Sequence, residues 1–336
     1  MQQTLQTVVF FKVNAEAEDG GEELATEFTV KGYPTFVMTN AEGETINRWW
    51  GFDGTPEFLQ TFNEAASDPT TIAEKQARFE SAPTSKDAGT LGDYYLTRNE
   101  VVEAAGYFEK AIELGDPEET YEVDLVLAKT IGVRDEVFTV DDVKAAADLA
   151  LLSPHISESQ TVEVVRWTIG VLDDEDSAAA APYIETGLMA TEGTDDEDLQ
   201  KARQRLLIAQ ALMVTGDKEL AVSLKRETMP EGWQADAGDL NGFAWWCFEN
   251  EVQLEEAEAL ARKGAELAED DLQKAQIIDT VAEIVNLRGD QDGAIALMQQ
   301  AIELDPDNDY YTEKRDRFAG VELVDTAEGT DSEASD

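Results

Sequence analysis

The chain has 336 residues, of which 25 are lysine or arginine and 73 are aspartate or glutamate, so its formal net charge is −48. This excess of negative charge repels the phosphates of nucleic acids and anionic membrane surfaces, and it argues against both as partners. A chain of this length with 42% hydrophobic residues can form two or more domains with buried cores. One cysteine, Cys247, excludes an intrachain disulfide, and no signal peptide or membrane span is recognisable in the sequence.

The N-terminal part of the chain predicts an alternation of strands and helices. The apolar run TVVFFKV at residues 7–13 is typical of a strand buried on both faces. The segment GGEELATEFTV at 20–30 carries apolar residues at helical spacing. Pro34 then stands at the start of a strand, where a proline is tolerated, and residues 35–50 predict a β-hairpin. A helix that begins at Pro56 follows the hairpin.

In their order and motifs, residues 5–67 resemble the C-terminal half of a thioredoxin-fold domain, so we assign 1–67 to an N-terminally incomplete thioredoxin-like domain. The resemblance implies that Pro34 is the family's cis-proline and that the backbone of Tyr33 pairs with an extended substrate chain. These two residues are therefore the expected substrate-binding positions. The Cys-x-x-Cys on which thioredoxin chemistry depends would lie upstream of Thr7, so we expect no catalytic residue in this chain.

The thioredoxin-like half also lacks the strand that, in the family, lies between its first apolar strand and the hairpin. We therefore expect Met1 to be an internal methionine of a longer reading frame, or a wrongly assigned start. A natural half-domain that a partner chain completes is the alternative. The compartment stays open: the chain as given is expected to be cytoplasmic, and an upstream targeting signal would make it extracytoplasmic.

From Asp68 onward the β-forming pattern stops, and helices of about ten to fifteen residues joined by polar turns are expected as far as Phe318. Residues 68–87 predict a helical linker, and 319–336 an acidic disordered tail. Residues 88–318 predict an array of helical repeats, with clear copies at 88–117, 240–270 and 275–308 and a poorly matching helical stretch at 120–235.

The three clear copies resemble tetratricopeptide repeats (TPRs), in which small residues let two antiparallel helices approach closely. The residues that carry the resemblance are Leu91, Gly92, Tyr95, Ala104, Phe108 and Ala111 in the first copy, Trp245, Phe248, Ala257, Ala261 and Gly264 in the next, and Ala294, Met298, Ala301 and Pro306 in the last. The predicted fold class is thus an α/β thioredoxin-like half-domain followed by an all-α, TPR-like helical solenoid.

The TPR resemblance implies a concave groove lined by the first helix of each pair. The expected groove residues are Asp93, Thr97, Glu249, Asn250, Asp279, Glu283 and Asn286. Basic side chains are nearly missing from this set, and only Lys86 at the edge of the first copy qualifies. An acidic wall repels a terminal carboxylate and favours basic or apolar polypeptide segments, less strongly as salt screens it. The alternative is that these acids belong to a uniformly acidic, salt-adapted surface.

No residue pattern predicts a cofactor or a metal site. His155 has no second histidine or cysteine to share a metal, and Cys247 is expected to be a small buried apolar group. Two function classes remain. The first is an interaction protein, redox-inactive as given, whose architecture is similar to that of bacterial chaperedoxins. The second is a truncated thiol–disulfide oxidoreductase whose Cys-x-x-Cys is encoded upstream of Met1, and the upstream DNA would distinguish the two.

Overall fold

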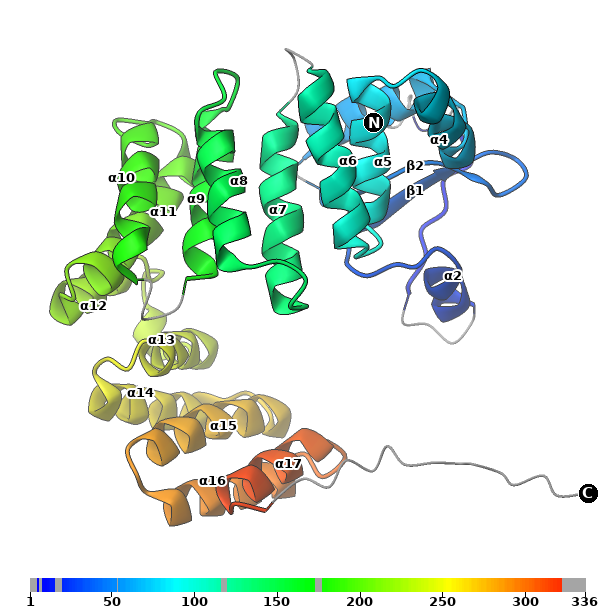
Figure 1. Cartoon of the computed structure of the whole chain (residues 1–336). Coiled ribbons are helices and arrows are strands. Elements are labelled where there is room, and N and C mark those ends of the chain that lie inside the picture. The colour runs from blue at the N-terminus through cyan, green and yellow to red at the C-terminus, as the bar shows by residue number, and fades with distance from the viewer. Residues whose placement is uncertain are drawn as a thin grey trace, which may run out of the picture. The chain divides into compact units, whose positions relative to one another are not determined.

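The computed structural model describes residues 5, 8–15, 20–52, 54–115, 120–172 and 177–321 (Figure 1). The chain divides into two compact units, Met1–Leu206 and Leu207–Asp336. The first unit contains a small β-hairpin and a succession of helices, and the described part of the second unit is helical. Almost all of the predicted acidic tail lies outside the described residues.

The elements follow one another with short connections. In the first unit they are α2 (Gly21–Glu27), β1 (Thr35–Thr39), β2 (Thr45–Trp50), α3 (Thr55–Ser67), α4 (Ile72–Ser81), α5 (Ser85–Leu96), α6 (Val101–Leu114), α7 (Tyr121–Arg134), α8 (Val140–Leu151), α9 (Glu158–Gly170) and α10 (Ala180–Ala190). Helix α11 (Glu197–Ala209) crosses the boundary, and the second unit continues with α12 (Lys218–Glu227), α13 (Ala237–Glu249), α14 (Leu254–Leu267), α15 (Asp271–Leu287), α16 (Gln291–Leu304) and α17 (Asp309–Phe318).

The predicted helix, hairpin and closing helix of the N-terminal part are all present. Strands β1 and β2 pair antiparallel, with Phe36 opposite Trp49, and Gly43 takes a positive φ of 88° in the turn between them. The Tyr33–Pro34 peptide is cis, as the thioredoxin resemblance implies. On one face of the hairpin the Phe36 ring stacks on Trp49 at 5.5 Å and meets Phe58 of α3 at 5.0 Å between ring centroids. This aromatic cluster fixes α3 on the hairpin.

The predicted strand at residues 7–13 is not formed, and this prediction was wrong. Its described part, residues 8–13, has no strand pairing, and Val9 and Phe11 are 87% and 80% exposed. The described sheet consists of β1 and β2 alone. Because a strand is stable only when a neighbour takes up its backbone N–H and C=O groups, an apolar run without such a neighbour stays irregular and exposed.

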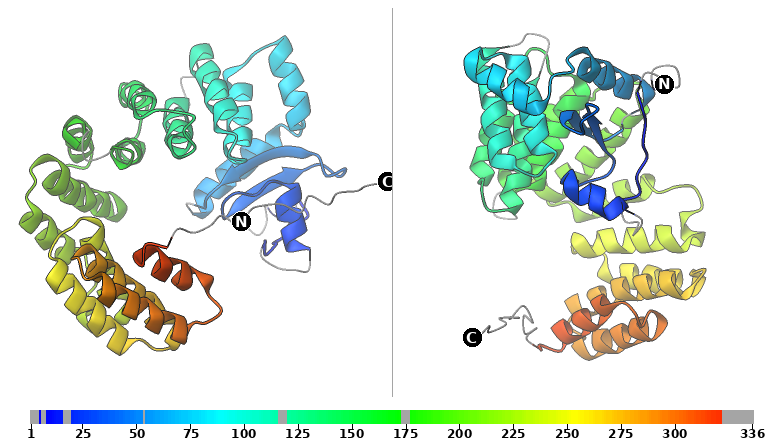
Figure 2. Two further views of the ribbon diagram at one scale, coloured as in Figure 1. Left: turned by 60° about the horizontal axis from the view of Figure 1, so that its bottom comes forward. Right: turned by 90° about the vertical axis from the view of Figure 1, so that its right-hand side faces the viewer.

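The TPR-like helix pairs are confirmed by how their small residues pack. Helices α5 and α6, α13 and α14, and α15 and α16 pack against each other as successive pairs (Figure 2). The predicted contact residues of the second helices are completely buried: Ala104, Phe108 and Ala111 in α6, Ala257 and Ala261 in α14, and Ala294, Met298 and Ala301 in α16.

The segment predicted as a helical linker contains a helix that packs on the first repeat. Helix α4 begins with a capping box between Thr71 and Glu74, in which each residue bonds the other's backbone N–H. Its Ile72 and Phe79 are buried in one cluster with Leu91 of α5. Helix α4 is therefore part of the core of the first unit.

Gly92 of α5 shows how closely the paired helices approach each other. A Cβ atom on Gly92 of α5 would lie 2.4 Å from the ring of Phe108, whereas a Cβ on Gly106 of α6 would have no neighbour within 4 Å. We expect Gly92→Ala to lower the free energy of unfolding of the first unit by ~1–3 kcal/mol through overpacking. The matched control Gly106→Ala should leave it unchanged or raise it by up to about 1 kcal/mol, because alanine is the better helix former. Urea unfolding of the full chain measures both, and equal effects of the two substitutions would contradict the close approach.

Candidate functional site

Thr97, one of the two predicted groove positions of the first copy, faces the chain's own hairpin. Strand β2 packs on α5, and Thr97 at the end of α5 is only 3% exposed. Its hydroxyl donates to the Asp93 carbonyl oxygen at 2.8 Å. Its own carbonyl oxygen accepts a hydrogen bond from Arg48 Nη2 at 3.1 Å. The expectation that Thr97 lines an open groove therefore does not hold, because the N-terminal segment covers it.

Arg48 of β2 is the centre of this contact. It is 1% exposed, and its guanidinium also donates to the carbonyl oxygens of Phe28 at 2.5 Å and Thr29 at 3.4 Å. Burial lowers the pKa of Arg48 to about 10, so the group stays charged at neutral pH. A buried cation that donates to three backbone carbonyls joins the residues after α2, strand β2 and the end of α5.

A second cluster of charged residues joins the hairpin to α4 and α5. Lys75 of α4 is 3% exposed and its ammonium donates to the carbonyl oxygens of Ile46 at 3.0 Å and Asp68 at 3.2 Å. Burial lowers the pKa of Lys75. Arg78 donates to Asp68 Oδ2 at 2.7 Å and, through Nε, to Asp87 Oδ2 at 2.8 Å.

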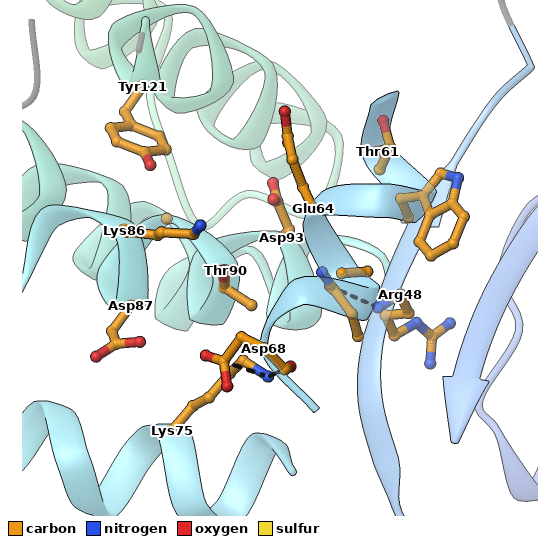
Figure 3. A pocket seen from close by; sticks show the side chains of 14 residues that line it. Arg48, Thr61, Glu64, Asp68, Lys75, Lys86, Asp87, Thr90, Asp93 and Tyr121 are labelled. Atoms are coloured by element: carbon orange, nitrogen blue, oxygen red, sulfur yellow. Dashed lines mark hydrogen bonds and ion pairs between the residues drawn. The ribbon is translucent and has the colours of Figure 1, made fainter. Parts of the chain in front are cut away.

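A small cavity of about 120 Å³ lies between these clusters, lined by β2, α3, α4, α5 and α7. Figure 3 shows Lys86 and Asp93 of α5, Glu64 of α3 and Tyr121 of α7 around it. Small-molecule sites are usually larger, at roughly 300–1,000 Å³. Asp68 and Asp87, which also line the cavity, are both bound to Arg78. The cavity is therefore a polar gap in a junction rather than a ready-made cofactor site.

The groove positions of the last copy are also covered, here by α17. Asp279 and Glu283 of α15 are 8% and 6% exposed. Lys314 and Arg317 of α17 form ion pairs with Glu283, the latter at 2.6 Å, and Tyr310 donates to Asp279 Oδ2 at 3.2 Å. Sequence reasoning placed these two acids in an open groove, and the structure corrects this because α17 packs over them.

The remaining predicted groove residues are accessible. Glu249 at the end of α13 is exposed, and Asn250 is half-buried with its amide donating to the Trp246 carbonyl oxygen at 2.7 Å. Asn286 and Asp93 are half-buried, and Lys86 is exposed. A role for these residues in binding stays a prediction.

The two positions expected to bind substrate lie at the start of the hairpin. Tyr33 is 68% exposed and Pro34 is exposed as well. Cys247 of α13 is completely buried in the second unit, as expected of a small apolar group. Burial raises the pKa of its thiol to about 12, so a thiolate does not form near neutral pH.

A metal-binding cluster and a membrane-spanning helix are both absent from the described residues. Within the described ranges, no three histidine, cysteine, aspartate or glutamate side chains are grouped so that they could hold a metal ion. Nor does any helix in the described part of the chain combine the length and the apolarity that crossing a membrane would need.

Sequence reasoning missed the residues that bind these segments together: Arg48, Lys75, Arg78, Lys314 and Arg317. Each is a basic side chain with a partner in another element, which no local pattern reveals. The one available signal is rarity, because basic residues are outnumbered about three to one in this chain.

Comparison with known proteins gives a fold likeness only. No protein-family model and no curated protein matches the chain. Similar solved structures include the APC/C hetero-tetramer Cut9–Hcn1, with 13% identity, a TM-score of 0.41 and coverage of 73% of this chain and 45% of that one. They also include YrrB, a TPR protein with an unusual peptide-binding site, with 15% identity, a TM-score of 0.34 and coverage of 72% and 97%. A third is TTC0263, a thermophilic TPR protein of Thermus thermophilus, with 16% identity, a TM-score of 0.27 and coverage of 70% and 98%.

The chain spans less than half of the length of the Cut9–Hcn1 chain that it matches. At these TM-scores the likeness carries no argument about function. The description of the chain as TPR-like therefore depends on its own helix pairs and their buried small residues.

The junction around Asp68 makes a pH-dependent contribution to stability. Burial by itself would raise the pKa of this carboxyl, but hydrogen bonds from Arg78 and Thr70 outweigh it and hold the pKa well below its usual range. A carboxyl whose folded-state pKa is depressed stabilises fully above its unfolded pKa, about 3.9, and this contribution is lost as the pH falls through the folded-state pKa.

We expect Asp68→Asn to lower the free energy of unfolding by ~1–2 kcal/mol at neutral pH and by progressively less below about pH 4. Asp141→Asn, which removes an acid paired with Lys144 on the surface and 88% exposed, serves as the control and should change stability little at either pH. Urea unfolding at neutral and acidic pH measures both variants. A deficit for Asp68→Asn that stays constant with pH would contradict the role given to its charge.

Proposed function

We propose that the protein is an interaction module, redox-inactive as given, whose TPR-like helix pairs bind basic or apolar segments of other polypeptides. The observation that supports the proposal comes from within the chain. A basic side chain of a neighbouring segment is bound at the predicted groove positions of both the first and the last copy: Arg48 at Thr97 and Lys314 at Glu283. The first helices of these pairs thus have the chemistry to hold cationic segments.

The charge of the surface favours the same class of partner. Glu249 at the end of α13 is exposed, and the chain as a whole carries a net charge of −48. A field of this sign raises the local concentration of cationic ligands and lowers that of anionic ones, and both effects weaken as added salt shortens the Debye length. A peptide that ends in acidic residues is therefore a poor partner.

We infer in addition that residues 5–67 are the C-terminal half of a thioredoxin-like domain. The order of α2, β1, β2 and α3 supports this inference, as does the aromatic packing of α3 on the hairpin. Tyr33 and Pro34, exposed at the start of β1, are the proposed positions for an extended substrate chain. This element order also favours the alternative, a truncated thiol–disulfide oxidoreductase, but the chain as given lacks the cysteine pair for that chemistry.

We expect the chain to show no turnover in an insulin-reduction assay, because Cys247 is its only cysteine and a buried thiol with a pKa near 12 is neither nucleophilic nor reachable. Thiol-specific reagents should react with the folded chain far more slowly than with the urea-unfolded chain. Cys247→Ala is the control in both measurements. Turnover that disappears in this variant would show that Cys247 is catalytic.

Calorimetry with a panel of basic, neutral apolar and acidic peptides of equal length tests the proposed partner class. We expect basic peptides to bind, to bind more weakly at high salt, and to lose affinity when Glu249 is replaced by glutamine; apolar peptides should bind with little salt dependence. Glu231→Gln, at an exposed position between α12 and α13, removes the same charge outside the predicted groove. Tight capture of a peptide with an acidic C-terminus would overturn the proposal, and equal losses in both variants would assign binding to overall charge alone.

A further inference from the structure

Residues 8–13, VVFFKV, form a contiguous apolar surface in the first unit. Val9 and Phe11 are 87% and 80% exposed, and no residue of the segment is acidic. Single exposed apolar residues are normal on a protein surface, whereas a run of them marks a contact with another surface. We call residues 8–13 the apolar segment. Its exposed apolar side chains are Val8, Val9, Phe10, Phe11 and Val13.

Strand β1 has one edge that the described chain does not pair. The Gly51 N–H donates to the Pro34 carbonyl oxygen at 3.1 Å, which places Pro34 at a hydrogen-bonded position opposite β2. Because such positions alternate along an antiparallel strand, Thr35 and Val37 direct their backbone groups away from β2. Among the described residues these backbone groups have no hydrogen-bond partner, and the sheet ends at β1. We call this the open edge of β1.

The other edge of the hairpin is covered by the chain itself. On the outer side of β2, the Lys75 ammonium donates to the Ile46 carbonyl oxygen at 3.0 Å, and β2 packs against α4 and α5. A sheet edge with unpaired N–H and C=O groups is a template for a further strand. Such a strand therefore has access to the hairpin at the open edge of β1.

The apolar segment and the open edge match in length and composition. Strand β1 has five residues, TFVMT, without a charge, and the segment of six residues carries one charged side chain, Lys12. Valine and phenylalanine, which make up the rest of the segment, favour strands. Two copies of a chain with a net charge of −48 repel each other, so their association is favoured where surfaces without acids meet. Pairing of the segment with the edge creates such a contact.

The partner that this match indicates is a second copy of the chain. Within one chain the apolar segment is not paired with β1, although both are present. Every copy carries one segment and one open edge. Two copies related by a two-fold axis can therefore exchange their segments, which covers both edges and leaves neither segment exposed.

We propose that the chain forms a two-fold dimer in which the apolar segment of each copy adds as a strand to the open edge of β1 of the other. This interface lies in the first unit and goes beyond the proposed binding of peptides by the helix pairs. It rests on apolar burial and backbone hydrogen bonds, and not on ion pairs.

Sedimentation of the full chain over a range of concentrations measures the dimer. We expect Val9→Glu with Phe11→Glu to raise its dissociation constant at least about tenfold, because pairing would remove two new charges from water. Leu152→Glu with Met189→Glu is the matched control, since these apolar residues are 82% and 70% exposed outside the segment. It should leave the constant unchanged. Equal weakening in both variants, or a wild type that is monomeric at every concentration, would overturn the proposal.

A substitution at the open edge tests the other half of the contact. Val37→Pro removes an outward N–H and keeps the bonds between β1 and β2, and proline is tolerated in an edge strand. We expect it to weaken the dimer about tenfold, while Val37→Ala, which keeps the N–H, weakens it less. Hydrogen exchange across β2 and α3 checks that the hairpin stays folded in both variants. A folded Val37→Pro variant that dimerises like the wild type would contradict the proposal.

Disulfide trapping distinguishes a second copy from the chain's own segment. In a Cys247→Ala background, one chain carries a cysteine at position 9, 10 or 11 and another carries Val37→Cys. Equal mixtures in a glutathione redox buffer should give linked dimers for at least one of the three positions, because paired strands bring the two thiols within bonding distance. Each variant alone should stay unlinked. When both cysteines are on one chain, an internal disulfide in a monomer would show that the segment docks on its own β1, which overturns the proposal.

Salt separates failure of this proposal from failure of the proposed function. Added salt should strengthen the dimer, because it screens the repulsion between two acidic copies, whereas it should weaken the binding of basic peptides. A dimer that salt weakens would assign the association to ion pairs and overturn this interface. A monomeric chain that binds basic peptides would refute the dimer alone. A dimer of the expected kind that binds no peptide of the panel would refute the proposed function and keep this inference.

Discussion

Close approach of paired helix backbones is the constraint on which the rest of this structure depends. With a net charge of −48, the parts of the chain repel one another at long range, so cohesion must come from short-range packing where charges are absent. Alanine at fully buried contacts such as Ala104, Ala261 and Ala301 provides it, and Gly92 lets the ring of Phe108 lie directly against the backbone of α5. Apart from Asp87, Asp279 and Glu283, the described acids can then occupy the outer faces of the helices without being buried.

Small-residue packing joins a helix to its pair, but it provides no way to attach a different kind of element. Basic side chains perform that task at two places. Arg48 and Lys75 connect the hairpin to the first helices through backbone carbonyls. Lys314 and Arg317 connect α17 to α15 through Glu283. Four of the chain's 25 lysines and arginines thus lie where these segments meet.

The repeats could be predicted from the sequence because their signal is local: alanines spaced by three and four residues fall on one side of a helix wherever that helix packs. The hairpin was equally predictable from its strand-forming residues and turn. The apolar run at 7–13 wrongly predicted a buried strand, because burial of such a strand depends on a neighbouring strand that no local pattern reveals. Asp279, Glu283 and Thr97 were assigned to the correct helices. Their burial under other segments of the chain depends on tertiary packing, which the sequence pattern does not indicate. The hydrogen bonds by which Arg48 joins β2 to the residues after α2 and to the end of α5 correspond to no periodic pattern in the sequence.

The environment of Lys75 has a consequence for chemical reactivity. An ammonium group has three protons, and here each is donated to a different backbone carbonyl oxygen, those of Ile46, Asp68 and Thr70. Burial lowers the pKa of this lysine, which at an open site would make the amine a better nucleophile. In this structure the Lys75 amine can lose a proton only if one of these three hydrogen bonds to a carbonyl oxygen breaks, which opens the contact around α4. Lys75 therefore combines a depressed pKa with resistance to acylation, so that amine-modifying reagents would report on separation of the hairpin from α4.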